Sequence, residues 1–453
     1  MMKKIRIGTR ESQLAVWQAT HVQELLHQNG YETELVYIKS EGDIDLQTPL
    51  YEIGVQGIFT RSLDIALLND RIDIAVHSMK DVPTQLAKGI AQAAVLKRAS
   101  SKDILVYKGN WEEFNSKLNT QNSKLTIATS SVRRKAQWLH RYPHHSIDNL
   151  RGNVNTRLRK LEESDWDGAI FAAAGLERID LRPSNSIDLD WMLPAPAQGA
   201  IMIACRGNDA AVLNACRPLN DADTELCTRI ERDFLASLMG GCTTPISALA
   251  IKQDDEILFK GNICTPDGVE SRDIKKVFLD TRSFITVTPV VSTALQSRLE
   301  ALSQKEIVAV FTSKNAERAV TVNKDLWKVY SISNRPSAHN ASDLADVIIN
   351  DGIKEVVFFC GDKRRDELPD KLKQQGVHVD EIIVYNTTET PRVVAEHYDG
   401  VLFYSPSAVK SFFSLNRLPS HTICYAIGKT TGLTIKAFCT NEVVIGDFKK
   451  GII

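Results

Sequence analysis

One short stretch, DIAVHSMKDVP, most constrains how this chain can fold, and it ends at Pro83. Ile72, Ile74 and Val76 alternate with smaller or polar residues, which predicts a β-strand. Open α/β sheets place their ligand sites in the polar segments beyond the carboxyl ends of their strands. The stretch therefore predicts an α/β fold with a ligand site near Asp81, although a strand that ends in a solvated turn has the same pattern.

Residues 1–98 predict one α/β unit built around this strand. Its first strand leads through Arg10 to a helix that Ser12 can cap. A basic side chain beside the free N–H groups of a helix N-terminus favours a bound anion. Residues 200–220 return to this unit after a crossing, LPAPAQGA, that contains Gln198.

Residues 99–199 predict a second α/β unit with hydroxyl groups and arginines where its strands end. These positions are Thr129, Ser130, Ser131, Arg133, Arg134, Arg151 and Arg157. Arg133 and Arg134 fall in the first turn of a predicted helix, where the helix dipole disfavours cations. Adjacent arginines in such a place suggest an anionic ligand, while a solvated basic face explains each cluster equally well on its own.

Residues 221–280 predict a smaller block that presents a cysteine. A predicted helix ends at the loop MGGCTTP, in which two glycines precede Cys242. This loop is unhindered and could present a reactive thiol, although a lone cysteine is more often buried and structural. Two further strands follow, separated by a Pro-Asp-Gly turn.

Residues 281–453 begin another α/β pattern. Strands are predicted at 307–311, 354–359, 381–385 and 400–404. Three of these strands end in polar turns, whose free N–H groups suit carboxylates or phosphates. Ordinary capping of helices by serine and threonine explains each turn equally well.

Composition excludes several classes of protein. A length of 453 residues predicts two to four domains, and no apolar run approaches the ~20 residues of a membrane span. The N-terminus lacks the features of a signal peptide, and the eight scattered cysteines show no metal-ligand spacing. We therefore expect a cytoplasmic protein without a metal site or membrane segment. A net charge of −1 and few aromatic residues near the basic clusters argue against nucleic-acid binding.

Six motifs, taken in order, closely resemble hydroxymethylbilane synthase, also called porphobilinogen deaminase. They are RES at 10–12, IAVHSMKDVP at 74–83, TSSVRR at 129–134, LRGNVNTR at 150–157, AQGA at 197–200 and GGCTTP at 240–245. The C-terminal part is similar to uroporphyrinogen-III synthase. That similarity rests on FFCGDKRRDELP at 358–369, FYSPSA at 403–408, AIGKTT at 426–431 and FTSKNA at 311–316.

The resemblance implies a specific architecture. It predicts two α/β domains like those of periplasmic binding proteins, a small α+β domain, and a uroporphyrinogen-III synthase-like α/β region. The first domain comprises 1–98 and 200–220, and the second comprises 99–199. The third, at 221–280, carries the cofactor cysteine, and the synthase-like region at 281–453 is shortened, without the opening strand and helix of its family. We expect a monomer.

The resemblance also implies the reaction. Four molecules of porphobilinogen, a pyrrole with an acetate and a propionate, condense with loss of ammonia on a dipyrromethane primer. Hydrolysis then releases the linear tetrapyrrole hydroxymethylbilane. The C-terminal region would close this product into a ring with inversion of the last pyrrole, unless that region is inactive and structural.

Each requirement of the deaminase reaction has a candidate residue. Asp81 would stabilise positive charge on the pyrrole nitrogen and move protons of the leaving amine, with Lys80 and Arg10 beside it. Cys242 would hold the dipyrromethane as a thioether. The carboxylates of the growing chain would be bound by Ser12, Thr129, Ser130, Ser131, Arg133, Arg134, Arg151, Arg157 and Gln198.

The synthase-like region offers weaker signals. Tyr385, with Thr430 or Thr431, would assist loss of hydroxide, and Ser407 and Lys314 would bind carboxylates. In the deaminase part, the family usually has a lysine where this chain has Gln56. A different possibility for the whole chain is a non-catalytic anion-binding protein that hinges around its ligand, in which Cys242 would be unmodified.

Overall fold

The first sheet combines two segments that are far apart in the sequence. Its strands are β1 (Ile5–Thr9), β2 (Thr33–Tyr37), β3 (Ile74–Ser78), β4 (Ile90–Val95) and β10 (Ile201–Arg206), in the order β2-β1-β3-β10-β4. β1 is parallel to β2 and β3, whereas β10 is antiparallel to β3 and β4. The computed structural model describes residues 4–39, 60–120, 123–238, 245–323, 325–332, 340–449 and 451–452.

Helices cover both faces of this sheet. α1 (Gln13–Gln28) and α7 (Ala210–Cys216) pack on one face, and α2 (Arg61–Leu68) packs on the other. The first four residues of β3 are buried, as expected for a central strand between two helical layers. A short 3-10 helix, η2 (Met79–Asp81), follows β3 directly and holds Asp81 at the edge of the sheet.

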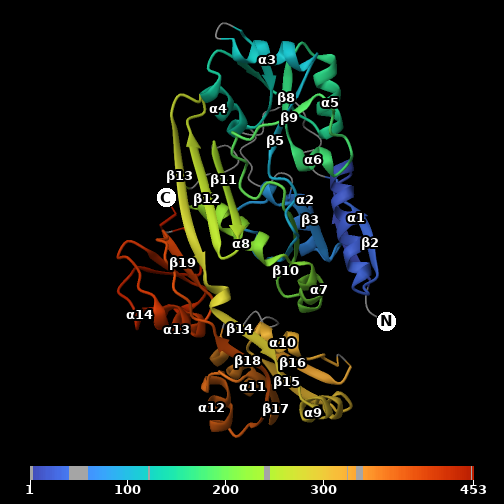
Figure 1. The fold of residues 1–453 in the computed structure, drawn as a ribbon. Coiled ribbons are helices and arrows are strands. Elements are labelled where there is room, and N and C mark those ends of the chain that lie inside the picture. Colours follow the sequence, from blue (N-terminus) through green and yellow to red (C-terminus); the bar gives the residue numbers. More distant parts are fainter. Residues whose placement is uncertain are drawn as a thin grey trace.

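The second sheet has the same architecture. Its strands are β5 (Asp103–Tyr107), β6 (Thr126–Ala128), β7 (Ser146–Asp148), β8 (Gly168–Ala172) and β9 (Ser186–Asp188), in the order β7-β6-β8-β5-β9. α3 (Trp111–Asn119) and α4 (Val132–Arg141) cover one face, and α5 (Val154–Glu163) and α6 (Ala173–Glu177) cover the other. Figure 1 shows this unit above the first one.

The third sheet joins the middle of the chain to its C-terminal part. α8 (Ala222–Ser237) precedes β11 (Ile246–Gln253), β12 (Glu256–Cys264) and β13 (Ser271–Asp280). These strands continue into β19 (Gly400–Phe403), β20 (Ile423–Ala426) and β21 (Val443–Ile445), so that six strands form one sheet. α13 (Pro406–Leu415) and α14 (Lys429–Lys436) accompany the last three strands.

β13 forms backbone hydrogen bonds with a neighbouring strand on each side. It runs antiparallel to β12 and parallel to β19, with Phe278 opposite Gly400. One hydrophobic core combines Phe234 of α8 and Phe278 with Tyr425 and Phe448 of the C-terminal part. The domain boundary predicted at residue 280 stays a prediction. The third sheet contains strands from both sides of this boundary. β13 thus gives β19 a parallel neighbour in a region that the sequence predicts to lack its opening strand.

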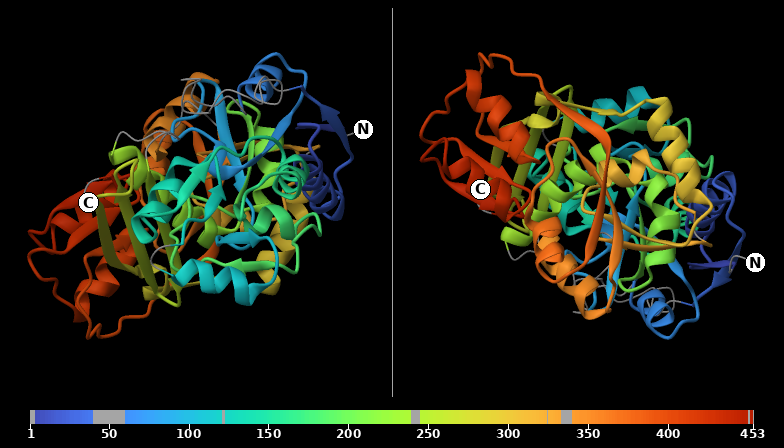
Figure 2. Two further views of the ribbon diagram at one scale, coloured as in Figure 1. Left: turned by 90° about the horizontal axis from the view of Figure 1, so that it is seen from above. Right: turned by 90° about the horizontal axis from the view of Figure 1, so that it is seen from below.

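A fourth sheet follows β13 in the chain. It contains β14 (Ile285–Pro289), β15 (Ile307–Phe311), β16 (Trp327–Ser331), β17 (Glu355–Gly361) and β18 (His378–Glu389), in the order β14-β18-β17-β15-β16. α9 (Thr293–Ser303) and α10 (Lys314–Ala319) lie on one face, and α11 (Ala341–Asn350) and α12 (Glu367–Gln374) lie on the other. In both views of Figure 2, the red strands at the C-terminal end lie beside the olive strands β11, β12 and β13, which together with α8 form the third unit.

The mixed α/β class predicted from the sequence is confirmed. Among the helices that the structure describes, none combines the length and the apolar character needed to cross a bilayer.

Candidate functional site

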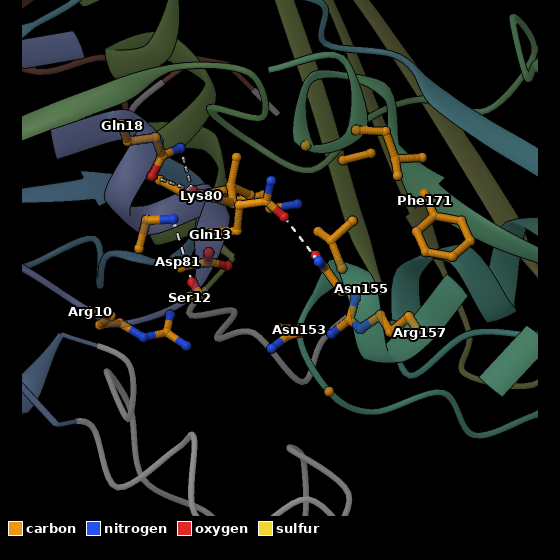
Figure 3. A pocket seen from close by; sticks show the side chains of 18 of the residues that line it. Arg10, Ser12, Gln13, Gln18, Lys80, Asp81, Asn153, Asn155, Arg157 and Phe171 are labelled. Atoms are coloured by element: carbon orange, nitrogen blue, oxygen red, sulfur yellow. Dashed lines mark hydrogen bonds between the residues drawn. The ribbon is translucent and has the colours of Figure 1, made fainter. Parts of the chain in front are cut away.

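A cavity of about 240 Å³ lies where the first two sheets face each other (Figure 3). It is lined by seven residues that the sequence predicts as site residues: Arg10, Ser12, Lys80, Asp81, Arg134, Arg151 and Arg157. They come from the start of α1, from η2, from α4 and from the segment that opens α5. Five of these side chains are cationic, and Asp81 is the carboxylate among the lining residues.

The start of α1 forms one wall of the cavity. Ser12 caps the helix, because its side-chain oxygen accepts a hydrogen bond from the backbone N–H of Ala15. Gln13 then reaches the facing wall, where Nδ2 of Asn155 donates to its Oε1 at 2.9 Å. This bond, drawn in Figure 3, joins the first and second units across the cavity.

Lys80 and Asp81 are neighbours on η2, at the carboxyl end of β3. Burial lowers the pKa of the Lys80 ammonium to about 8, although the charge of Asp81 opposes this shift. Nζ of Lys80 donates to Oε1 of Gln198 at 3.4 Å, which ties η2 to the crossing segment between the units. The cavity thus has one carboxylate next to an ammonium group whose pKa is lowered to about 8.

Arg133 and Arg134 both bind a buried aspartate that sequence reasoning missed. Nη1 of Arg133 donates to Oδ2 of Asp103 at 2.7 Å, and Nη2 of Arg134 donates to Oδ1 at 2.7 Å. Nε of Arg134 also donates to Oδ1 of Asp103 at 3.0 Å, and Nε2 of Gln198 donates to the same oxygen at 2.9 Å. Burial alone would raise the pKa of Asp103, but the two guanidinium charges outweigh it and hold the pKa far below its usual range.

Arg151 lies just before α5, and Arg157 is the fourth residue of that helix. Arg151 is buried, and Arg157 carries a buried Nε with no hydrogen-bond partner among the described residues. Burial, followed by the charge of Arg134, lowers the pKa of Arg157 to about 10. A buried guanidinium nitrogen without an acceptor is costly, so this wall of the cavity is suited to an anionic ligand.

The three hydroxyl residues before α4 bond to the backbone. Ser131 caps α4 by accepting a hydrogen bond from the N–H of Arg134, and Thr129 accepts one from the N–H of Ser131. Ser130 donates to the carbonyl of Leu150. These bonds fix the turn that starts α4, and with it the position of Arg134.

His77 also lines the cavity, although the sequence predicted no role for it. It lines the cavity at the end of β3 and is buried. Burial, followed by the charge of Arg10, lowers the pKa of its imidazole to about 4, so that His77 is neutral at pH 7. Nε2 of Gln18 likewise reaches Oγ of Ser78 at 3.0 Å and supports the same strand end. Cys242 and Gln56 lie outside the described residues.

The site residues predicted in the C-terminal part lie beside two different sheets. The hydroxyl of Tyr385, on β18, donates to Oγ of Ser313 at 3.1 Å, and Ser313 caps α10, which begins at Lys314. Burial raises the pKa of the Tyr385 hydroxyl. Ser407 lies in the first turn of α13, and Thr430 and Thr431 lie in the first turn of α14, beside the third sheet. Of these two threonines, Thr431 is buried and Thr430 is exposed.

In the part of the chain that the structure describes, no cluster of three or more histidine, cysteine, aspartate or glutamate side chains could hold a metal ion.

Three family models match successive parts of the chain. Residues 5–214 match the dipyromethane cofactor binding domain of porphobilinogen deaminase, and residues 225–283 match the C-terminal domain of that family. Residues 324–447 match uroporphyrinogen-III synthase HemD.

Curated relatives agree with the first two matches. The chain is 41% identical over 274 residues to porphobilinogen deaminase from Acidithiobacillus ferrooxidans, which covers 59% of this chain and 87% of the relative. It is 42% identical over 273 residues to the chloroplastic enzyme from Oryza sativa, covering 58% of this chain and 75% of that one. A solved uroporphyrinogen-III synthetase from Helicobacter pylori is 15% identical, with a TM-score of 0.28, over 38% of this chain and 95% of that structure. The chain therefore belongs to the porphobilinogen deaminase family, and a region of the uroporphyrinogen-III synthase family is fused behind its deaminase part.

Proposed function

We propose that Asp81 and the surrounding cations carry out the hydroxymethylbilane synthase reaction of this chain, with a dipyrromethane attached to Cys242. The observation that carries this proposal is the charge of the cavity: five cationic side chains surround one carboxylate. Porphobilinogen brings two carboxylates with each pyrrole ring, and its ring nitrogen becomes positive during loss of ammonia. The lining complements both features of the substrate.

The same lining fits a bound dipyrromethane, which is itself a polycarboxylate. Arg157 offers a buried Nε that lacks a hydrogen-bond partner among the described residues, and Arg151 lies on the same wall. α8 ends at Ser237, shortly before Cys242 in the chain. When bound, the dipyrromethane supplies the free pyrrole α-carbon to which substrate units are added.

Each residue of the cavity has a separable task. The carboxylate of Asp81 faces the pyrrole nitrogen and stabilises its positive charge as ammonia leaves. Arg10, Lys80 and Arg157 bind substrate carboxylates and hold the ring in place, which converts binding energy into orientation. Arg134 lines the cavity while its other hydrogen bonds go to Asp103 and to the carbonyl of Ile170.

Ammonia release from porphobilinogen tests the role of Asp81. The Asp81→Asn variant keeps the size of the side chain and removes its charge, so kcat should fall by about 10²–10³-fold. Asp165→Asn is a matched control, because Asp165 is exposed on the second unit, and it should release ammonia at the normal rate. Normal turnover by Asp81→Asn would refute the assigned role.

The C-terminal region adds the cyclase reaction of its family. We infer that Tyr385 assists loss of hydroxide from hydroxymethylbilane, since its half-buried hydroxyl donates to Oγ of Ser313 at the start of α10. Oxidation of the products and separation of the uroporphyrin isomers tests cyclisation by the whole chain. A type III product supports it, and a type I product alone would mean that this region is structural.

A further inference from the structure

A second large cavity lies between the second and third units, and α4 separates it from the cavity described above. Its volume is about 550 Å³. α4 contributes Arg134 to the cavity of the proposed deaminase site, called the deaminase cavity below, and it contributes His140 and Arg141 to this one. The facing wall consists of β11, β12 and β13, which lie beside α4 in Figure 1. None of the roles proposed above uses this cavity.

Two lysines stand side by side on the sheet wall. Lys260 on β12 is the direct cross-strand partner of Lys275 on β13, and both are exposed and line the cavity. Directly opposite side chains of an antiparallel pair have Cβ atoms only about 4.5–5.5 Å apart, so like charges there destabilise the sheet. Neither ammonium has an ion-pair or hydrogen-bond partner among the described residues. An anion bound between them would remove this repulsion.

Arg141 brings a third cation from the opposite wall. Its guanidinium lies over the ring of Trp191, at 4.9 Å from the centroid, and both residues line the cavity. Stacking on an indole holds the guanidinium in place while its N–H groups stay available for a ligand. Nε of Arg141 donates to the hydroxyl of Tyr142, and no carboxylate of the described residues pairs with its guanidinium.

The cations of the lining outnumber its carboxylates. Asp190 is paired with Lys102, at 2.7 Å, and Lys102 also binds Asp188. Asp273 accepts a hydrogen bond from Nδ2 of Asn262 at 2.7 Å. In total the lining carries four cationic side chains, including Lys102, and two carboxylates. The surplus of positive charge comes from both walls.

We propose that this cavity binds a compact anion with two or more negative groups, phosphates or carboxylates, between Lys260, Lys275 and Arg141. The two lysines and the stacked guanidinium reach the ligand from different units, so that a bound polyanion connects α4 to the sheet that follows the Cys242 loop. Phosphates and carboxylates share the chemistry that these cations recognise.

Calorimetric titration of the full chain with inorganic pyrophosphate, and separately with tricarballylate, tests the proposal at low ionic strength. We expect one class of sites to weaken at least tenfold in the Lys260→Gln/Lys275→Gln variant. Sites in the deaminase cavity should stay unchanged in that variant. The probe that binds more tightly shows whether phosphate or carboxylate is the ligand chemistry.

Two further variants keep the test specific. Lys305→Gln/Lys354→Gln removes the same charge from exposed positions of the C-terminal part, and its affinity should stay within twofold of the original chain. Lys260→Arg/Lys275→Arg keeps the charge and should restore binding. Ammonia release at the normal rate shows that each variant is folded. The proposal is overturned if no second class of sites is found, or if both glutamine variants bind alike.

Discussion

Arg134 donates two hydrogen bonds to Oδ1 of Asp103, at 3.0 Å from Nε and 2.7 Å from Nη2. Asp103 opens β5 and is fully buried, whereas Arg134 lines the deaminase cavity. The pair therefore connects the core of the second unit to the proposed substrate site. Because Gln198 joins the same carboxylate, the connection extends to Lys80 on the first unit.

Replacing Asp103 by asparagine should destabilise the chain strongly. The change leaves the charges of Arg133 and Arg134 buried without their common partner, which costs about 3–5 kcal/mol. Urea unfolding followed by circular dichroism measures the loss. Asp190→Asn is the control, since this side chain is 74% exposed, and it should cost less than about 1 kcal/mol. Equal stability of the two variants would contradict the central role of Asp103.

Substrate binding should weaken as the pH rises through about 8. The lowered pKa means that Lys80 loses its proton there, so the KM for porphobilinogen should rise while kcat changes less. Lys80→Arg keeps its charge and should show a flat KM over the same range. A rise of equal size in Lys80→Arg would assign the effect to another group.

The same lowered pKa has an opposite effect on stability. Unfolded Lys80 keeps its proton up to its usual pKa of 10.5, so the unfolded chain binds more protons between pH 8 and that value. The contribution of Lys80 to the free energy of unfolding therefore increases with pH across this interval. Urea titrations of the original chain and Lys80→Met at pH 8 and at about pH 10 measure this difference, and an identical pH dependence would contradict it.

Because the core is shared, a destabilising substitution in the C-terminal part should also lower the deaminase activity. Phe448 is buried, and its ring lies 5.0 Å from that of Tyr425, within the core that includes Phe234 of α8. Phe448→Ala should cost about 3–5 kcal/mol and lower ammonia release and ring closure together on warming. Loss of ring closure alone at the same temperatures would show that the two parts unfold separately.

Leu433→Ala is the matched control for this prediction. Leu433 lies on α14 of the same region and is 67% exposed. Its truncation should change the free energy of unfolding by no more than about 0.5 kcal/mol.

Tyr385→Phe should change the product and leave ammonia release unaffected. The variant lacks the hydroxyl that bonds to Ser313, so unassisted closure should shift the product toward the type I isomer. Isomer separation after oxidation measures the ratio. Tyr330→Phe is the control, because its hydroxyl, on the same sheet, bonds to Asp351, and it should retain the type III product. A type III product from Tyr385→Phe would refute the proposed role.

Much of the fold could be predicted because its signals are local. The alternation in β3, the polar residues of η2 and the cap at Ser12 are all readable in short stretches. The order of the motifs also predicted which residues would belong to one site, and seven of them line one cavity.

The rest depends on contacts between distant residues. Nothing around Asp103 distinguishes it from an aspartate in a loop, since its partners follow about 30 residues later. The pairing of β13 with β19 joins positions 278 and 400, and it is selected by the packing of the whole core. His77 was part of a recognised motif, but its neutral state depends on burial and on Arg10.

The most direct test of the account is the intact mass of the purified chain beside that of Cys242→Ser. If Cys242 carries the primer for a cavity that binds polycarboxylates, the original chain should be heavier than its sequence by one dipyrromethane unit. The serine variant should have the mass of its sequence alone. An unmodified original chain, or an adduct that persists in Cys242→Ser, would contradict the account.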